Sequence, residues 1–129
     1  MMQNKSRILI IDDEPDTTLA FEKSLRDKGF ITVDTVNDPL LALSSFKAGS
    51  YDLLIIDIVM PQMDGFNLYE EIRKLDDRVK VCFITAFDIN YRALRAVFPN
   101  ANSIEDIDCF IKKPVSVEDL VEHIEGELR

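Results

Sequence analysis

The chain has 129 residues, the length of one domain, and we expect residues 1–129 to form a single domain with its own hydrophobic core. Hydrophobic residues make up 47% and charged residues 30% of the sequence, which excludes intrinsic disorder over most of the chain. The formal net charge of −9 argues against nucleic acid or an anionic membrane as a direct ligand, so a cation or a basic protein is the better-matched partner.

Short β-branched runs alternate with amphipathic segments of helix length along the whole chain. In chain order, they predict a strand at 7–11, a helix at 15–28, a strand at 30–36, a helix at 38–48, a strand at 52–57, a helix after Gly65, a strand at 79–84, a helix at 90–97, a strand at 109–111 and a helix from Ser116. Asp38 favours a helix start, and Ser116 with Asp119 resembles a capping box. Helical spacing predicts these inward residues: Leu19, Leu25, Leu68, Ile72, Leu75, Leu120, Ile124 and Leu128.

This strict alternation predicts an α/β fold, a doubly wound five-stranded parallel sheet with helices on both faces. The first strand is apolar at successive positions, so we expect both of its faces to be covered. In such sheets the ligand binds beyond the carboxyl ends of the strands. The residues that directly follow each strand are therefore the candidate site.

Neither a membrane segment nor a disulfide is predicted. Apolar runs such as Leu53–Ile56 fall far short of the ~20 residues that span a bilayer, and no charged-then-apolar leader precedes Lys5. The two cysteines, Cys82 and Cys109, are too few for a disulfide framework and too far apart in sequence for a metal-binding knuckle. We expect both to be reduced core residues of a cytoplasmic protein.

Charged and polar side chains follow four of the predicted strands: Asp12, Asp13, Glu14, Asp57, Thr85, Lys112 and Lys113. Two carboxylates about 4 Å apart repel by roughly 4 kcal/mol at an effective dielectric constant of 20, unless a proton or a cation lies between them. Oxygen ligands without His or Cys suit Mg²⁺, and a lysine with a hydroxyl suits a bound anion. Each residue alone is common as a turn former or a cap, but the set indicates phosphoryl transfer onto an aspartate.

Four motifs, in this order and spacing, resemble the receiver domain of two-component response regulators over essentially the whole chain: Ile8–Glu14, Asp57–Gly65, Ile84–Ala86 and Phe110–Pro114. The resemblance implies a flavodoxin-like, CheY-like fold with five parallel strands in the order 2-1-3-4-5. It also implies that a histidine kinase or a phosphotransfer protein phosphorylates the domain. We expect a stand-alone receiver that signals through an unidentified protein target, unless an output domain has been separated from it.

The positions of residues within these motifs assign the Mg²⁺ ligands and the residue that accepts the phosphoryl group. The resemblance implies that Asp57 accepts the phosphoryl group and also binds Mg²⁺. Asp12 and Asp13 match the family's acidic pair, with Asp13 the more direct ligand and Asp12 acting partly through water. The backbone carbonyl of Val59 matches the third protein ligand. We expect no enzyme activity beyond self-phosphotransfer and slow autodephosphorylation.

The same motifs assign the residues that respond to phosphorylation. Thr85 matches the hydroxyl that turns toward the phosphoryl group. Lys113, directly before Pro114, matches the lysine that contacts it, whereas Lys112 is expected on the other face of its strand. Phe110 matches the aromatic residue whose rotamer follows activation. The resemblance thus implies that moving Thr85 lets Phe110 swing inward, a two-state change driven by local charge.

The sequence departs from the family at two places. The segment between Thr85 and Lys113 is longer than usual, and Phe98–Asp108 replaces the family's stretch of small residues and glycine, which alters a surface that receivers commonly use to dimerise. Either a tolerated insertion or a dedicated partner surface accounts for it. Val59 and Phe87 occupy the positions from which family members place the hydrolytic water, and neither side chain can hydrogen-bond water. The phosphorylated state is therefore expected to decay slowly.

Alternative functions stay open on the sequence alone. A degenerate receiver would act as a binding module that does not depend on phosphorylation. An aspartyl phosphatase that uses Mg²⁺ would carry a second Asp two residues after the nucleophile, where this chain has Val59. A flavin-binding protein would need a glycine-rich phosphate loop after the first strand, where Asp12, Asp13 and Glu14 would repel phosphate.

Overall fold

The computed structural model of the chain describes residues 4–86, 96, 107 and 109–129. Its helices and strands, in chain order, are β1 (Asn4–Ile11), α1 (Pro15–Asp27), β2 (Phe30–Val36), α2 (Pro39–Ser45), β3 (Leu53–Asp57), α3 (Gly65–Leu75), β4 (Lys80–Thr85), β5 (Phe110–Lys112) and α5 (Val117–Leu128). Phe87, nearly all of the predicted helix at 90–97 and most of the segment Phe98–Asp108 lie outside the described residues. Among the helices that are described, none is long and apolar enough to cross a membrane.

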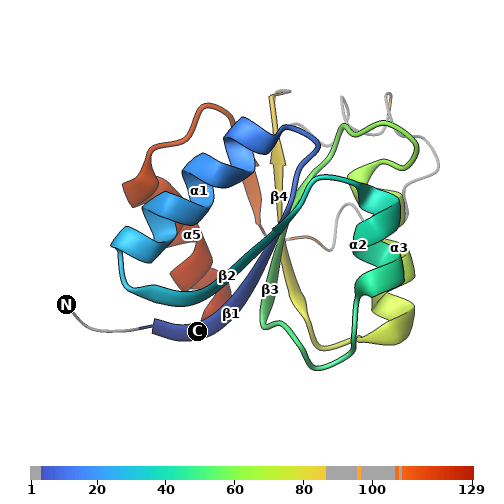
Figure 1. Cartoon of the computed structure of the whole chain (residues 1–129), viewed down its shortest axis with the longest axis horizontal. Coiled ribbons are helices and arrows are strands. Elements are labelled where there is room, and N and C mark those ends of the chain that lie inside the picture. The colour runs from blue at the N-terminus through green and yellow to red at the C-terminus, as the bar shows by residue number, and fades with distance from the viewer. Residues whose placement is uncertain (1–3, 87–95, 97–106, 108) are drawn as a thin grey trace.

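The five strands form one parallel sheet in the order β2-β1-β3-β4-β5, which confirms the predicted fold class and strand order. Figure 1 shows α1 and α5 against one face of the sheet and α2 and α3 against the other. The chain reverses its direction of winding between β1 and β3, the two strands on either side of the switch point. A ligand of such a sheet binds at the carboxyl ends of these strands.

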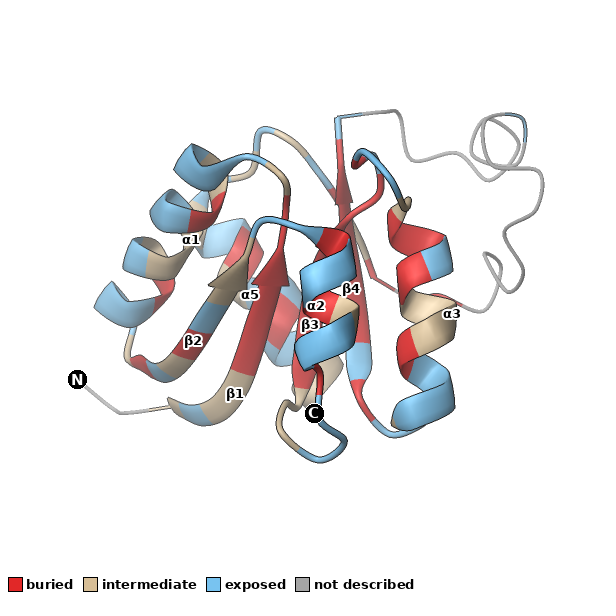
Figure 2. Ribbon diagram, turned by 45° about the vertical axis from the view of Figure 1, so that its right-hand side comes forward, coloured by how far each residue is buried: buried red, intermediate tan, exposed pale blue. Residues whose placement is uncertain are grey.

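Both faces of the sheet are buried, because side chains along each strand alternate between two hydrophobic layers. In β1, Ile8 and Ile10 pack in the layer that contains α1 and α5 residues, whereas Leu9 and Ile11 pack in the layer that contains α2 and α3 residues. Leu53–Ile56 of β3 has no exposed surface at all. Figure 2 shows this buried core running through the middle strands, with exposed residues on the outer faces of the helices.

The two predicted N-cap residues are confirmed. Asp38 accepts a hydrogen bond from the Leu40 N–H at 2.9 Å, and Ser116 accepts one from the Asp119 N–H at 3.1 Å. The second helix, however, is shorter than the predicted range of 38–48. It ends at Ser45, because Phe46 adopts an extended backbone and buries its ring in the core.

Most of the predicted inward residues are buried: Leu25, Leu68, Ile72, Leu120 and Ile124. Leu128, the last residue of α5, is partly buried and packs against the hydrophobic layer that contains Leu120 and Ile124. For Leu19 and Leu75 the prediction is wrong, since they are 66% and 52% exposed. The buried face of α1 contains Thr18 and Leu25, and Leu19 lies beside that face; Leu75 is the last residue of α3.

The structure contradicts the prediction that both cysteines are reduced. Cys82 of β4 and Cys109, directly before β5, form a disulfide, with their Cα atoms 4.6 Å apart. Phe83 pairs with Phe110 in the β4–β5 register, so the preceding residues Cys82 and Cys109 also lie opposite each other. Strand order, rather than distance in sequence, brings the two sulfur atoms together.

Gly65 allows α3 to begin directly against the end of β3. A Cβ at this position would collide with the carbonyl oxygen of Asp57 and lie 3.0 Å from atoms of Ile56 and Ile58. We therefore expect Gly65→Ala to lower the free energy of unfolding by about 1–3 kcal/mol, the cost of overpacking. Gly126→Ala in α5 is the matched control, because a Cβ there meets nothing within 4 Å. Urea unfolding measures both; a Gly65→Ala variant as stable as the control would contradict the argument.

Candidate functional site

Four of the predicted side chains meet at the carboxyl edge of the sheet. They follow or end four different strands: Asp12 after β1, Asp57 at the end of β3, Thr85 at the end of β4 and Lys113 after β5. Asp12 and Thr85 have no exposed surface, and Asp57 is 5% exposed. Burying ionisable groups is costly unless they are paired, so their partners define the chemistry of the site.

Lys113 connects the two buried carboxylates. Its Nζ lies 2.8 Å from Asp12 Oδ2 and 3.5 Å from Asp57 Oδ2. Its backbone N–H donates to the Thr85 carbonyl at 2.8 Å, which fixes where the side chain starts. Burial lowers the pKa of Lys113, but the hydrogen bond with Asp12 and the charge of Asp57 outweigh it, so the pKa lies above its usual value. Lys113 therefore stays positively charged between the two acids.

The ionised form of Asp57 is unfavourable in this site. Burial raises the pKa of Asp57 and the charge of Asp12 raises it further, whereas Lys113 and the Val59 N–H lower it, and the balance is a pKa of about 7. An ordinary Asp has a pKa of roughly 3.9. An additional cation would stabilise the ionised Asp57, since only part of the local negative charge is compensated by Lys113.

In the absence of metal, we expect Asp57 to make stability fall as the pH rises from about 4 to 7. The folded chain keeps the Asp57 proton up to a pKa of about 7, whereas the unfolded chain releases it near the usual value of roughly 3.9. The folded state thus binds more protons in this window, and the free energy of unfolding decreases as the pH rises, by roughly 4 kcal/mol at most.

Asp57→Asn removes this titration and serves as the matched variant. At pH 8 we expect it to be more stable than the unmodified chain in urea unfolding without metal. The difference should shrink toward pH 5, where the native carboxyl is protonated in the folded state. A difference that is the same at both pH values would contradict the raised pKa.

The acidic residues at this edge have the donor set that Mg²⁺ prefers. Asp12, Asp13 and Asp57 each offer a carboxylate oxygen, and these atoms all lie within 4.8 Å of one another. Mg²⁺ binds such carboxylates and keeps further positions for water and phosphate oxygens. The Val59 N–H donates to Asp57 Oδ1 at 3.3 Å, which places this peptide beside the cluster. The residues present therefore fit a magnesium ion.

Phe110 belongs to an aromatic cluster on the α3 side of the sheet. Its ring stacks on Phe83 with centroids 5.9 Å apart and meets Phe66 edge-on at 6.5 Å. Thr85 lies two residues beyond Phe83, and alternate residues of a strand face the same side. Thr85 and Phe110, the two predicted switch residues, are therefore on neighbouring strands and on the same face.

Sequence reasoning missed the side chain that holds the loop after β1. Asn37, between β2 and α2, donates from Nδ2 to the Asp12 carbonyl at 2.8 Å and to Thr18 Oγ1 at 3.0 Å. It thereby links the acidic loop to α1 and fixes the backbone that presents Asp12. Only its place directly after a strand could have marked it, because Asn is common in loops.

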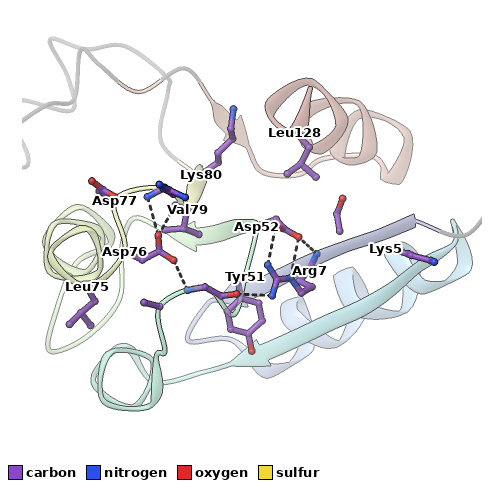
Figure 3. A pocket seen from close by; sticks show the side chains of 14 residues that line it. Lys5, Arg7, Tyr51, Asp52, Leu75, Asp76, Asp77, Val79, Lys80 and Leu128 are labelled. Atoms are coloured by element: carbon purple, nitrogen blue, oxygen red, sulfur yellow. Dashed lines mark hydrogen bonds and ion pairs between the residues drawn. The ribbon is translucent and has the colours of Figure 1, made fainter.

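A hollow of about 950 Å³ lies at the other edge of the sheet, but it has no converging reactive groups. Figure 3 shows that Arg7, Asp52 and Asp76 make structural contacts there. Arg7 pairs with Asp52 at 3.1 Å and donates to the Gly49 carbonyl at 2.7 Å. Asp76 accepts the N–H groups of Gly49 and Arg78 at 2.9 and 3.0 Å. This edge holds the loops that begin the strands.

Comparisons with known proteins agree with this geometry. The family model of the response regulator receiver domain matches residues 8–125. The chain is 30% identical over 128 residues to the transcriptional regulatory protein RprY of Bacteroides fragilis and 33% identical over 129 residues to the probable transcriptional regulator ycf27 of Guillardia theta. These alignments cover 99% of the chain but 51% and 47% of the relatives, so the chain spans about half the length of the curated relatives it matches.

Solved structures give the same result. The response regulator protein TrrA from Thermotoga maritima, in complex with Mg²⁺-BeF, has a TM-score of 0.78 and 31% identity, covering 95% of this chain and 99% of that chain. A CheY-like receiver domain protein from Methanospirillum hungatei has a TM-score of 0.75 and 26% identity, covering 97% and 94%. The match over residues 8–125, the strand order and these neighbours together show that the chain belongs to the response regulator receiver domains, the phosphorelay domains of two-component systems.

Proposed function

We propose that this receiver accepts a phosphoryl group on Asp57 from a histidine kinase or a phosphotransfer protein, with Mg²⁺ as its cofactor, in the cytoplasm. The observation that carries the proposal is the placement of Asp57, which is buried at the carboxyl edge with the ammonium group of Lys113 bridging it to Asp12. A carboxylate with nearby cationic support and a cluster of oxygen ligands is suited to attack phosphorus.

Each residue of the site has a separate task in the transfer. An oxygen of Asp57 attacks the phosphorus while the bond to the donor breaks, and the donor keeps the electron pair. Lys113 Nζ, 3.5 Å from Asp57 Oδ2, compensates negative charge on the phosphoryl oxygens. Asp12, Asp13, Asp57 and the Val59 carbonyl are the proposed ligands of Mg²⁺, which supplies further charge compensation when it is bound.

The output depends on Thr85 and Phe110. The new phosphoryl group carries about −1.5 to −2 charge, which attracts the Thr85 hydroxyl. Because Thr85 and Phe110 lie on the same face of neighbouring strands, a shift of Thr85 changes the space available to the Phe110 ring. The changed surface near β5 is then available to a downstream protein, and the net charge of −9 favours a basic partner over nucleic acid.

The remaining alternatives have less support. The family is not a known class of enzymes, and we propose that this chain performs only self-phosphotransfer and slow autodephosphorylation. A binding module that does not depend on phosphorylation has no need of Asp12, Asp57 and Lys113 in contact at a buried site. The position of a phosphatase's second Asp is taken by Val59, which is 48% exposed and cannot transfer a proton.

Beryllofluoride, an analogue of the phosphoryl group, tests the proposal directly. With Mg²⁺ present, we expect saturable binding of beryllofluoride and NMR shifts at Thr85 and Phe110. Asp57→Asn should remove these shifts, whereas Asp77→Asn, on the exposed loop at the other edge, should keep them. Binding without any change at Thr85 or Phe110 would refute the proposed switch, and no binding at all would refute the proposed acceptor site.

Asp13→Ala separates metal binding from folding. We expect Mg²⁺ affinity to fall by at least roughly tenfold, equal to about 1.4 kcal/mol of lost binding free energy, because one carboxylate is removed from the cluster. Stability without metal should stay equal or rise, since the repulsion with Asp57 is relieved. Calorimetric titration with Mg²⁺ and urea unfolding measure the two effects. A loss of several kcal/mol in metal-free stability would instead give Asp13 a structural role.

A further inference from the structure

The disulfide between Cys82 and Cys109 lies next to the predicted switch. These are the only two cysteines of the chain, and they join β4 to the start of β5. Cys109 directly precedes Phe110, and Cys82 is three residues before Thr85. Beyond this covalent link, β5 is held to β4 by a short ladder, since the strand has three residues, Phe110–Lys112.

One of the two sulfur atoms can be approached from outside. Cys82 has no exposed surface and Cys109 is 3% exposed, but Cys109 lines a cavity of about 590 Å³ beside α5. Gly126 lines the same cavity, and a Cβ at this position would meet nothing within 4 Å, so the helix leaves an opening here. A reagent that enters the cavity therefore reaches Cys109 before Cys82.

The surroundings of Cys109 favour thiol chemistry. His123 of α5 places Nδ1 4.0 Å from Cys109 Sγ, and a neighbouring imidazole stabilises a thiolate. Among the described residues, Asp119, Glu122 and Glu127 also line the cavity, against one arginine, Arg129. This excess of carboxylates repels an anionic thiol such as glutathione and admits a neutral dithiol.

We propose that Cys82 and Cys109 form a reversible thiol–disulfide exchange site, which a neutral dithiol or a protein dithiol reaches through the cavity beside α5 and which sets how firmly β5 is held to β4. Disulfides in reducing compartments are usually transient or redox-sensing, which fits the cytoplasmic location proposed above. No residue of the phosphorylation site takes part in the exchange itself.

The exchange balances as a two-electron reaction. A thiolate of the dithiol attacks Cys109 Sγ, the bond between the cysteines breaks, and Cys82 leaves with the electron pair and takes up a proton. The second thiol of the reductant then attacks the reductant sulfur that is bonded to Cys109. The mixed disulfide breaks, and Cys109 is released as a thiol. The protein gains two electrons and two protons, and the dithiol becomes a disulfide. A disulfide oxidant reverses the sequence.

The first experiment uses the native chain with dithiothreitol as the neutral dithiol and glutathione as the anionic thiol. Alkylation and mass spectrometry count the free thiols over time. We expect dithiothreitol to reduce both cysteines without denaturant and oxidised dithiothreitol to restore the disulfide. Between two monothiols at equal thiol concentration, the neutral 2-mercaptoethanol should react at least fivefold faster than the anionic glutathione. Reduction that requires denaturant would overturn the proposal and leave a purely structural disulfide.

Two substitutions test the route of access. Gly126→Gln should slow reduction by dithiothreitol at least fivefold, because its side chain occupies the opening at the cavity. Ser44→Gln, on an exposed position of α2, is the control and should leave the rate unchanged. Equal rates in both variants would overturn the proposed route. His123→Gln should slow alkylation of Cys109 in the reduced protein while urea unfolding stays unchanged.

Hydrogen exchange tests the effect on the sheet. In the reduced protein we expect the amides of Phe110–Lys112 to exchange at least tenfold faster, with Ile8–Ile11 of β1 unchanged. Equal protection of β5 in both states would overturn its dependence on the disulfide. In the oxidised chain the two cysteine sulfur atoms and a carboxylate oxygen of Glu127 lie within 4.8 Å of one another. If one equivalent of Zn²⁺ binds there and blocks reoxidation, the pair is a metal site and the exchange proposal fails.

A last measurement rests on the proposed function. Because β5 carries Phe110 and leads to Lys113, the disulfide should hinder the movement of β5 that accompanies activation. We therefore expect the oxidised chain to bind beryllofluoride roughly fivefold or more weakly than the reduced chain, a typical coupling between sites. Equal affinity in both redox states would overturn this coupling. Absence of binding in both states would count against the acceptor site, while the thiol measurements above would still decide the exchange site.

Discussion

Replacing Asp57 by Asn is expected to abolish phosphorylation by acetyl phosphate in the presence of Mg²⁺. The amide nitrogen and oxygen cannot act as the nucleophile that a carboxylate provides. The change keeps the size of a side chain that is 7% exposed, so the fold should be retained. Mass spectrometry should show the added phosphoryl group on the unmodified chain and none on the variant. The modification should also be labile in base, as an acyl phosphate is.

Two controls decide whether a loss of phosphorylation is specific to Asp57. Asp77→Asn changes an exposed carboxylate at the opposite edge and should be labelled like the unmodified chain. Asp57→Asn should also be at least as stable as the unmodified chain at pH 8, because a carboxyl with a pKa of about 7 is unfavourably ionised there. Label that persists on Asp57→Asn, for example on Asp13, would show that the acceptor was assigned wrongly.

The sheet was predictable because its central strands are buried on both faces. Residues such as Ile8–Ile11 and Leu53–Ile56 form unbroken apolar runs, and in the structure they alternate between two buried layers. The parallel order then follows from helices between successive strands. Candidate site residues were predictable for the same reason, because parallel strands deliver their carboxyl ends to one edge. The contact of Lys113 with Asp12 and Asp57 agrees with that expectation.

The errors come from features that a one-dimensional pattern does not contain. Helical spacing cannot distinguish a residue on the buried face from its neighbour, which is why Leu19 was placed inside although it is 66% exposed. The cysteines were separated by 27 residues, and only the register between β4 and β5 places Cys82 beside Cys109. The raised pKa of Asp57 could not be predicted from the sequence either, because it depends on burial and on the distance to Asp12.

The phosphoryl group on Asp57 is expected to be long-lived. Val59 lies beside the acceptor, since its N–H donates to Asp57 Oδ1 at 3.3 Å, and the residue is 48% exposed. An aliphatic side chain cannot hold a water molecule in line with the phosphorus. The resemblance assigns Phe87 to the second water-positioning place, although this residue lies outside the described part of the chain. Phosphorylation itself needs neither side chain.

Polar replacements should therefore accelerate hydrolysis. Groups that position water or act as a base contribute about 10²–10⁴-fold in enzymes, and regulators use only part of that range. We expect Val59→Asn with Phe87→Glu to shorten the lifetime roughly ten- to a hundredfold, a part of that enzymatic range. The measurement is the decay of phosphorylated protein after the donor has been removed.

Val59→Ala separates hydrogen bonding from simple access. Alanine is smaller than valine and still cannot hydrogen-bond water, so its decay rate should stay close to that of the unmodified chain. If Val59→Ala decays as fast as Val59→Asn, the size of the side chain controls the lifetime, because both changes open the approach to Asp57. If only the asparagine variant decays faster, the hydrogen bond to water is the controlling interaction. A double variant no faster than the unmodified chain would show that neither position limits hydrolysis, and that the water is held by other groups around Asp57.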